Sequence, residues 1–348
     1  MSLVAMWYVI AGAMLAMYVV LDGFDFGVGM LHLFVARNDA ERRAVLRSIG
    51  PVWGGNEVWL LAAGGSLLVA FPTLLAASFS GFYLPLIIVV WLLLFRALGI
   101  ELRHQVDHPL WHQFWDVTFA AASLLLAVFF GAALGNVIRG VSLDAHQQFF
   151  APLWTNFLIG ADTGILDWYT LLVALTVTPA LAQHGALWLA ARVGEPIGGR
   201  ALAVAQRLWP VVSIATVVTM LATLFVQERV MAQVAERPWG VVFPAAAVAC
   251  LMGVRHAGRR AQPGRAFLAS AGYLVTTLAS AAFGIFPAVL PARDAALSLT
   301  IANAAAEPYG LRVALYWWIP GIGLALAYTA FVYGRILTPV GVGDASEH

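Results

Sequence analysis

Residues 4–35 read VAMWYVIAGAMLAMYVVLDGFDFGVGMLHLFV, an apolar run interrupted by Asp22, Asp25 and His32. A helix needs about 20 mostly apolar residues to cross the hydrocarbon core of a bilayer, so this run predicts a membrane-spanning helix. A carboxylate in hydrocarbon costs about 2.5–3.5 kcal/mol on insertion scales. Two carboxylates in one span therefore indicate a helix face that is turned toward protein or water rather than lipid. The alternative is a purely structural role, in which the two buried acids only anchor a neighbouring helix.

The whole chain has the composition of an integral membrane protein. Of its 348 residues, 61% are hydrophobic and 11% are charged, whereas soluble domains have about 25% charged residues. All 19 basic residues are arginines, and the net charge of +1 gives no indication of nucleic-acid binding. The single cysteine, Cys250, cannot form an intrachain disulfide. The first residues lack the basic segment of a cleavable signal peptide, so we expect none.

Nine apolar segments have the length of membrane spans. They cover residues 4–35, 51–71, 79–102, 114–138, 158–190, 203–227, 239–257, 265–287 and 313–337. They predict an all-α fold, a polytopic membrane helical bundle of about nine transmembrane helices in a single integral-membrane domain over residues 1–348. Candidate halves are 1–138 and 158–287, with a peripheral helix over 313–337. The second segment is the weakest because it is short and opens with polar residues.

The arginines are distributed unequally between the two sides that nine spans define. Fourteen lie on the side that holds the connections after the first, third, fifth and seventh spans and the end of the ninth, and five lie on the other. Without the second span the counts would be nine and ten. Because cytoplasmic loops are enriched in arginine, we expect the N-terminus in the periplasm and the C-terminus in the cytoplasm.

This orientation brings polar residues of the first three spans to one depth. Asp22 and Asp25 lie past the middle of the first span, three residues apart and so near one helical face. Glu57 lies about six residues into the second span, roughly 9 Å deep, and the third span ends with Arg96 and Glu101. Clusters of ionisable groups in a membrane commonly mark ion or proton routes. A structural ion-pair network is the alternative interpretation.

The segment WGGNEVW at residues 53–59 adds one more candidate to this group. Asn56 can form hydrogen bonds across helices, and the neighbouring Gly54 and Gly55 allow helices to approach closely. We therefore include Asn56 with the four acids and Arg96.

The histidines give little support for a metal or haem site. His104, His108 and His112 are spaced by four, but Pro109 interrupts the helix between them. His32 and His184 lie near span ends, yet neither has a partner at the spacing of axial haem ligands. We expect no metal and no cofactor on this chain. Asp162 and Asp167 are expected to be cap and interface residues.

Six blocks of sequence together resemble one known family. They are DGFDFGVGM (22–30), RNDAERR (37–43), SIGPVWGGNEVWL (48–60), ASFSGFY (77–83), FRALG (95–99) and FPAVLP (286–291). In this order they are similar to subunit II of the cytochrome bd-type quinol oxidases, including the cyanide-insensitive branch.

The resemblance implies a fold of two four-helix bundles plus a peripheral helix, in a bacterial inner membrane. It implies a partner, subunit I, that carries haems b and d (or b only) and the quinol site, while this chain holds no haem and helps to deliver cytoplasmic protons. A small single-helix subunit and a bound quinone or lipid are further candidates. The family has an aspartate directly after the tryptophan of the third block, where this chain has Gly54. Glu57 is the nearest substitute.

Two other function classes stay open at this point. A secondary transporter or ion channel could use the same acids, although we find no inverted repeat of the transporter kind. A purely structural membrane scaffold could use them to hold helices together.

Overall fold

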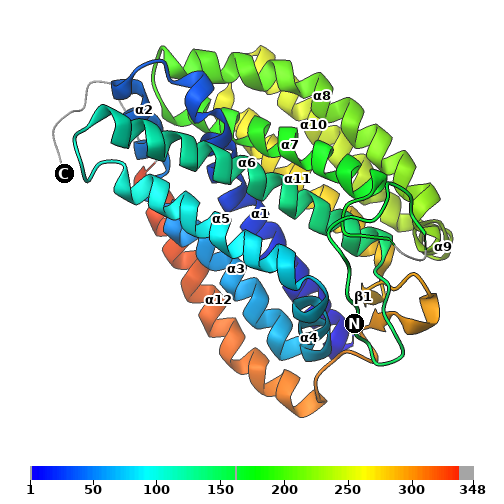
Figure 1. The fold of residues 1–348 in the computed structure, drawn as a ribbon. Helices are drawn as coiled ribbons and strands as arrows, with labels where there is room; N and C mark the ends of the chain where they lie inside the picture. Colours follow the sequence, from blue (N-terminus) through cyan, green and yellow to red (C-terminus); the bar gives the residue numbers. More distant parts are fainter. Residues whose placement is uncertain (1, 161–162, 337–348) are drawn as a thin grey trace.

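The computed structural model describes residues 2–160 and 163–336 (Figure 1). Over these residues the chain forms twelve α-helices, two 3-10 helices and one two-stranded antiparallel sheet. The α-helices are α1 (Leu3–Val35), α2 (Asp39–Ile49), α3 (Trp53–Ala70), α4 (Pro72–Gly81), α5 (Tyr83–Leu102), α6 (Pro109–Arg139), α7 (Trp168–Arg192), α8 (Ile197–Val226), α9 (Glu228–Glu236), α10 (Val242–Arg259), α11 (Pro263–Ile285) and α12 (Pro308–Ile336). The short elements are η1 (Pro238–Val241), β1 (Ala288–Leu290), η2 (Ala295–Leu297) and β2 (Leu299–Thr300).

Eight of the described helical segments are long and apolar enough to cross a membrane, namely α1, α5, α6, α7, α8, α10 with η1, α11 and α12. The predicted second span appears as α3, which passes the same test only together with α4, and the two are bent by 118°. The bend lies at Phe71, directly before Pro72, because a residue that precedes proline is disfavoured in the helical region. The expected all-α polytopic bundle is confirmed, with α3–α4 as the ninth candidate span.

α1 is the central helix of the bundle, with α3, α6 and α7 packed around it (Figure 1). Its glycines allow a very close approach to α7. A Cβ atom on Gly27 would lie 2.1 Å from the carbonyl oxygen of Leu181, and one on Gly185 would lie 2.4 Å from the backbone of Gly27. The backbones of α1 and α7 therefore touch, which fixes the position of the acidic segment of α1 in the core.

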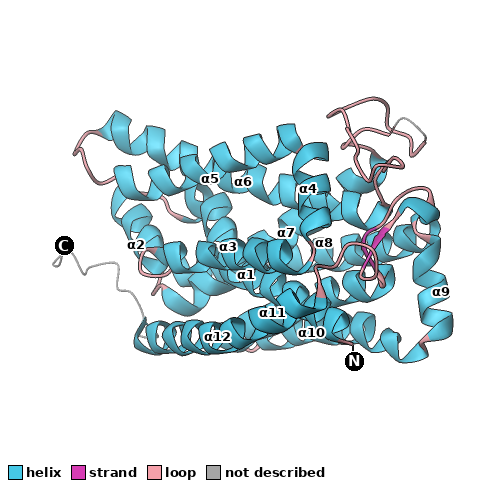
Figure 2. Ribbon diagram, turned by 90° about the horizontal axis from the view of Figure 1, so that it is seen from below, coloured by secondary structure: helices cyan, strands magenta, loops and turns pink. Residues whose placement is uncertain are grey.

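The two ends of the bundle have different character. At one end α2 lies across the helix ends, and Glu41 of α2 forms an ion pair with Arg200 of α8 at 2.7 Å. At the other end lie α9, the β1–β2 sheet and the loop over residues 140–160 (Figure 2). The start of α1 and the end of α12 lie at opposite ends, as an odd number of crossings requires (Figure 1).

Several boundaries differ from the sequence prediction for local reasons. α7 begins at Trp168 instead of residue 158, because the Asp167 carboxylate accepts hydrogen bonds from the backbone N–H groups of Tyr169 and Thr170. α6 begins at Pro109 instead of residue 114, since proline suits the first position of a helix. The connection over 36–50 contains α2, whose first turn is capped by Asn38.

α12 lies along the outside of the bundle, and none of the side chains in its most apolar stretch is buried. This is the position expected for the helix over 313–337, of which residue 337 lies outside the described residues. The division into halves 1–138 and 158–287 stays a prediction.

Candidate functional site

Five of the six candidate residues meet in one cluster between α1, α3 and α5. Arg96 donates a hydrogen bond from Nη1 to Oδ1 of Asp22 at 2.5 Å and one from Nη2 to Oε2 of Glu57 at 3.1 Å. Asn56 donates from Nδ2 to Oδ2 of Asp25 at 2.9 Å. Asp22, Asp25 and Arg96 are completely inaccessible to solvent, whereas the Glu57 side chain is 27% exposed. The cluster thus extends from the fully buried interior, at Asp22 and Asp25, to the surface of the chain at Glu57.

Further contacts hold this cluster in place. The Asn56 amide also donates to the backbone carbonyl of Leu21 at 3.2 Å, which ties α3 to α1. The guanidinium of Arg96 lies over the ring of Phe26, 4.7 Å from its centroid, and a cation–π contact of this kind favours the charged form in an apolar setting. Small and aromatic residues of the block at 22–30 therefore position the acids that the same block carries.

The cluster has an excess of acid. It contains three carboxyl groups, Asp22, Asp25 and Glu57, and a single cation, Arg96. Oδ2 of Asp22 and Oδ1 of Asp25 make no hydrogen bond within the described residues. Like charges that share a desolvated site cannot all be ionised at low cost. The arrangement can therefore hold at least one exchangeable proton.

Tyr333 of α12 belongs to the same network, although the sequence analysis did not identify it. Its hydroxyl donates to Oδ1 of Asn56 at 2.8 Å. The two residues are 277 positions apart, and a tyrosine in an apolar span carries no signal that could have assigned it to this site.

Glu101 does not join the cluster, in contrast to the sequence prediction. Its side chain is exposed in the last turn of α5. It follows Arg96 by five residues, which places it about 140° around the helix axis from Arg96. Similar depth in the membrane did not bring the two to the same face.

A second buried ionic network lies nearer the end at which α2 is found. Asp116 of α6 accepts hydrogen bonds from Nε of Arg103 at 2.6 Å and from Nη1 of Arg42 at 3.0 Å, and its Oδ1 lies 2.6 Å from Nε2 of His32. Arg103 also donates to Asp39 of α2 at 2.6 Å. The network joins α1, α2, α5 and α6. Asp116 was recognisable as an acid within the predicted span 114–138, but its partners were not.

The acids of α2 lie outside the spans and are stabilised in their charged form. Partial burial raises the pKa of the Asp39 carboxyl, but the hydrogen bond and charge of Arg103 and the charge of Arg43 outweigh this, so the pKa lies below its ordinary value. For Glu41, burial likewise raises the pKa, and the backbone N–H of Arg37 and the guanidinium of Arg200 lower it further than burial raises it. Both groups remain ionised at neutral pH and hold α2 against the bundle.

The other histidines do not form a metal centre within the described residues, which contain no group of three His, Cys, Asp or Glu side chains suited to a metal. His184 uses both ring nitrogens: Nδ1 lies 2.6 Å from the Ser270 hydroxyl and Nε2 lies 3.0 Å from the carbonyl oxygen of Val20. Nε2 of His32 is occupied by Asp116. At His184 these contacts leave no ring nitrogen available for a haem iron, whereas Nδ1 of His32 makes no hydrogen bond within the described residues. Asp162 lies outside the described residues.

Known proteins with related sequences and structures identify the family. Residues 3–336 match the family described as cytochrome bd terminal oxidase subunit II. The chain is 31% identical to the cytochrome bd ubiquinol oxidase subunit 2 of Bacillus subtilis, over 90% of this chain and 89% of that protein. It is 30% identical to the cytochrome bd-I ubiquinol oxidase subunit 2 of Escherichia coli K12, over 95% and 93%.

The fold agrees with this assignment. The structure of the bd oxidase from Geobacillus thermodenitrificans superimposes with a TM-score of 0.78 at 15% sequence identity, covering 96% of this chain and 98% of that chain. The chain therefore belongs to the family of cytochrome bd terminal oxidase subunit II and is a subunit of an oxidoreductase complex.

Proposed function

We propose that this chain is the haem-free subunit of a quinol:oxygen oxidoreductase, that it supports a haem-bearing subunit I, and that it helps to supply cytoplasmic protons for the reduction of oxygen to water. The relatives in Bacillus subtilis and Escherichia coli are named as subunits of ubiquinol oxidases, which supports quinol as the substrate of the complex. Haems b and d, or b only, belong to the partner in this proposal.

The observation that carries the proton role is the acid excess of the Asp22–Asp25–Glu57 cluster around the single Arg96. A purely structural network would gain most from equal numbers of acids and bases, because each buried charge then has a partner. Three acids on one base leave a carboxyl group that can take up and release a proton. Asn56 and Tyr333 extend the hydrogen-bonded chain.

Glu57 is the residue through which the proposed proton route leaves this chain toward subunit I. It lies on a face of α3 where Leu61 is 73% exposed and Val58 is 56% exposed, and a Cβ atom on Gly54 or Gly55 would meet nothing within 4 Å. A carboxyl group that faced lipid there would be costly, and small residues favour close helix–helix packing in membranes. We therefore place subunit I on this face.

We place the chain in a bacterial inner membrane with its N-terminus in the periplasm. Nine spans assign fourteen of the nineteen arginines to the side at which α2 lies, and cytoplasmic loops are rich in arginine. A cytoplasm-active reporter fused after His348 should be active, and a periplasm-active reporter at the same position should be silent. The reverse result would contradict the orientation and the cytoplasmic source of the protons.

The proton role is tested by oxygen consumption with quinol in the purified complex. Asp25→Asn and Glu57→Gln should each slow turnover by about tenfold or more, in line with the loss of a proton-transferring group, while the haem spectrum and the subunit ratio stay unchanged. Gly54→Asp added to Glu57→Gln should restore part of the rate, because Gly54 has room for a side chain and lies one helical turn from Glu57. Asp107→Asn, a change of a fully exposed acid in the loop before α6, is the matched control.

Unchanged oxygen uptake in both single variants would remove this subunit from the proton route and leave it a scaffold. Expression of the chain alone tests the haem-free assignment: we expect no Soret band. A stoichiometric haem that is lost in His32→Ala or His184→Ala would overturn that part of the proposal.

A further inference from the structure

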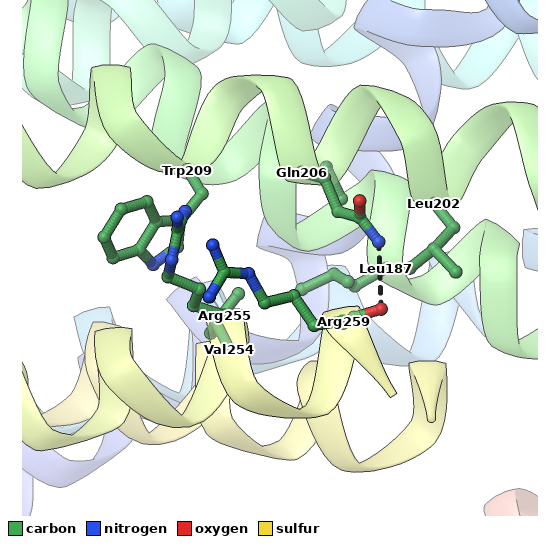
Figure 3. A pocket seen from close by; sticks show the side chains of 9 residues that line it. Leu187, Leu202, Gln206, Trp209, Val254, Arg255 and Arg259 are labelled. Atoms are coloured by element: carbon green, nitrogen blue, oxygen red, sulfur yellow. Dashed lines mark hydrogen bonds between the residues drawn. The ribbon is translucent and has the colours of Figure 1, made fainter. Parts of the chain in front are cut away.

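A cavity of about 220 Å³ opens between α8 and α10, with α7 behind it (Figure 3). Leu187, Leu202 and Val254 form its apolar part, and Gln206, Trp209, Arg255 and Arg259 supply its polar groups. It lies at the arginine-rich end of the bundle, where the span that includes α10 ends at Arg259. The cavity is therefore at the depth of lipid headgroups.

The walls of the cavity are fixed by hydrogen bonds. Gln206 donates from Nε2 to the carbonyl oxygen of Gly258 at 2.9 Å, and Trp209 donates from Nε1 to the carbonyl oxygen of Leu251 at 2.7 Å. The guanidinium of Arg255 lies over the ring of Trp209, 4.2 Å from its centroid. This cation–π contact orders the Arg255 side chain before any ligand binds.

The cavity has positive charge without a matching acid. Within the described residues, no carboxylate lies within 4 Å of the guanidinium of Arg255 or Arg259. Arg42, Arg103 and Arg200 at the same end all have carboxylate partners. A second hollow of about 460 Å³ adjoins the first and is lined by Met252, His256 and Arg260 as well as the two arginines.

From these features we infer that the cavity binds an anionic phospholipid, with the headgroup phosphate between Arg255 and Arg259. Arginine is suited to bidentate hydrogen bonding with phosphate oxygens, and basic pockets between membrane helices on an arginine-rich side favour anionic headgroups. The apolar wall and the exposed apolar side chains of Val211 and Val248, farther along α8 and α10, provide the surface for acyl chains. A free anion would need no such surface. The inference does not depend on the proposed proton route.

The test measures which lipid the whole oxidase complex retains. The complex is placed in nanodiscs of phosphatidylcholine that contain a minor fraction of phosphatidylglycerol, extracted with mild detergent, and analysed by native mass spectrometry. The double variant Arg255→Gln/Arg259→Gln should retain about thirtyfold less phosphatidylglycerol than the wild type, since a basic residue near an anionic headgroup contributes about a factor of five. Arg259→Gln alone leaves the contact of Arg255 with Trp209 intact and should give an intermediate loss of phosphatidylglycerol. It serves as the test variant if the double variant folds poorly.

The control removes the same charge from the same end of the bundle. Arg207→Gln/Arg265→Gln changes two arginines that do not line the cavity and should retain phosphatidylglycerol like the wild type. Equal loss in both double variants would indicate general attraction of anionic lipid and would overturn the inference. Unchanged retention in Arg255→Gln/Arg259→Gln would also overturn it. Displacement of the lipid by inorganic phosphate in excess would identify a site for free anions and would overturn the assignment to a lipid.

Discussion

The buried pair of Asp22 and Arg96 allows a quantitative test of the ionic network. Both side chains are completely buried, and one oxygen–nitrogen distance is 2.5 Å. Asp22→Asn leaves the Arg96 guanidinium in the core with the partly exposed Glu57 as its remaining ion-pair partner within the described residues. Breaking a buried pair by removing one member costs about 3–5 kcal/mol, because the other charge stays desolvated. We expect Asp22→Asn and Arg96→Met each to destabilise the complex by about this amount.

The double variant Asp22→Asn/Arg96→Met should be much less damaging than either single change. Removing both charges also removes both desolvation costs, and replacement of a whole buried pair by neutral groups is often neutral or stabilising. Glu57 loses its partner in this variant, but its side chain is 27% exposed and so is not sealed in the core. We therefore expect the double variant to lie within about 2 kcal/mol of the wild type, with a coupling of several kcal/mol between the two sites.

The assay is the unfolding free energy of the purified complex in a denaturant series, read from tryptophan fluorescence and from loss of the partner subunit. Arg43→Gln serves as the control, because Arg43 pairs with Asp39 on the surface of α2, where an ion pair contributes less than about 1 kcal/mol. If the double variant is destabilised by the sum of the two single effects, the two residues act independently and the buried-pair argument is refuted.

Three further predictions concern the core, the second network and pH. Gly27→Ala should prevent assembly of the complex in co-expression, because its Cβ atom would lie 2.1 Å from the carbonyl oxygen of Leu181, whereas Gly12→Ala in the same helix should assemble normally because its Cβ atom meets nothing within 4 Å. Asp116→Asn should lower the unfolding free energy by about 3 kcal/mol, as expected for a buried acid with two arginine partners, and a wild-type denaturation midpoint would contradict this. Since the pKa of Glu41 is lower in the folded chain than its ordinary value of 4.5, its stabilising effect is present above that value and is lost as the pH falls below it. Acid titration from pH 6 to about pH 3 should therefore destabilise the wild type more than Glu41→Gln, and equal slopes would count against a role for this ion pair.

Much of the fold could be predicted from the sequence because a membrane leaves few alternatives. Backbone groups in hydrocarbon must be bonded within the chain, so long apolar segments become helices, and α1, α5, α6 and α8 follow directly. α2 and α9 were missed as helices because they are short and polar and lie outside the spans. Their existence depends on local caps such as Asn38 and on packing against the bundle, which hydropathy does not report.

The part of the candidate site that could be predicted is the part set by the depth and charge of residues within their spans. The depth of Asp22, Asp25, Glu57 and Arg96 in their spans was sufficient to predict that they are close together. Opposite charges buried in a membrane form pairs. Depth does not give the direction in which a helix face points, and for this reason Glu101 was included wrongly in the cluster. Contacts between distant parts of the chain, such as the one that Tyr333 makes, depend on tertiary packing alone.

The two buried ionic networks differ in a way that assigns them different roles. In the network around Asp116, the two acids Asp116 and Asp39 face three arginines, Arg103, Arg42 and Arg43, and His32 lies beside Asp116. Acids that all have arginine partners gain nothing from taking up a proton, and such a set is suited to holding helix ends together. In the network around Arg96, the acids outnumber the base, and two carboxyl oxygens are without a hydrogen bond in the described chain. We therefore propose that a change in protonation costs less there than around Asp116, and that the two networks, both of which include residues of α1, divide the proton-transfer and structural roles.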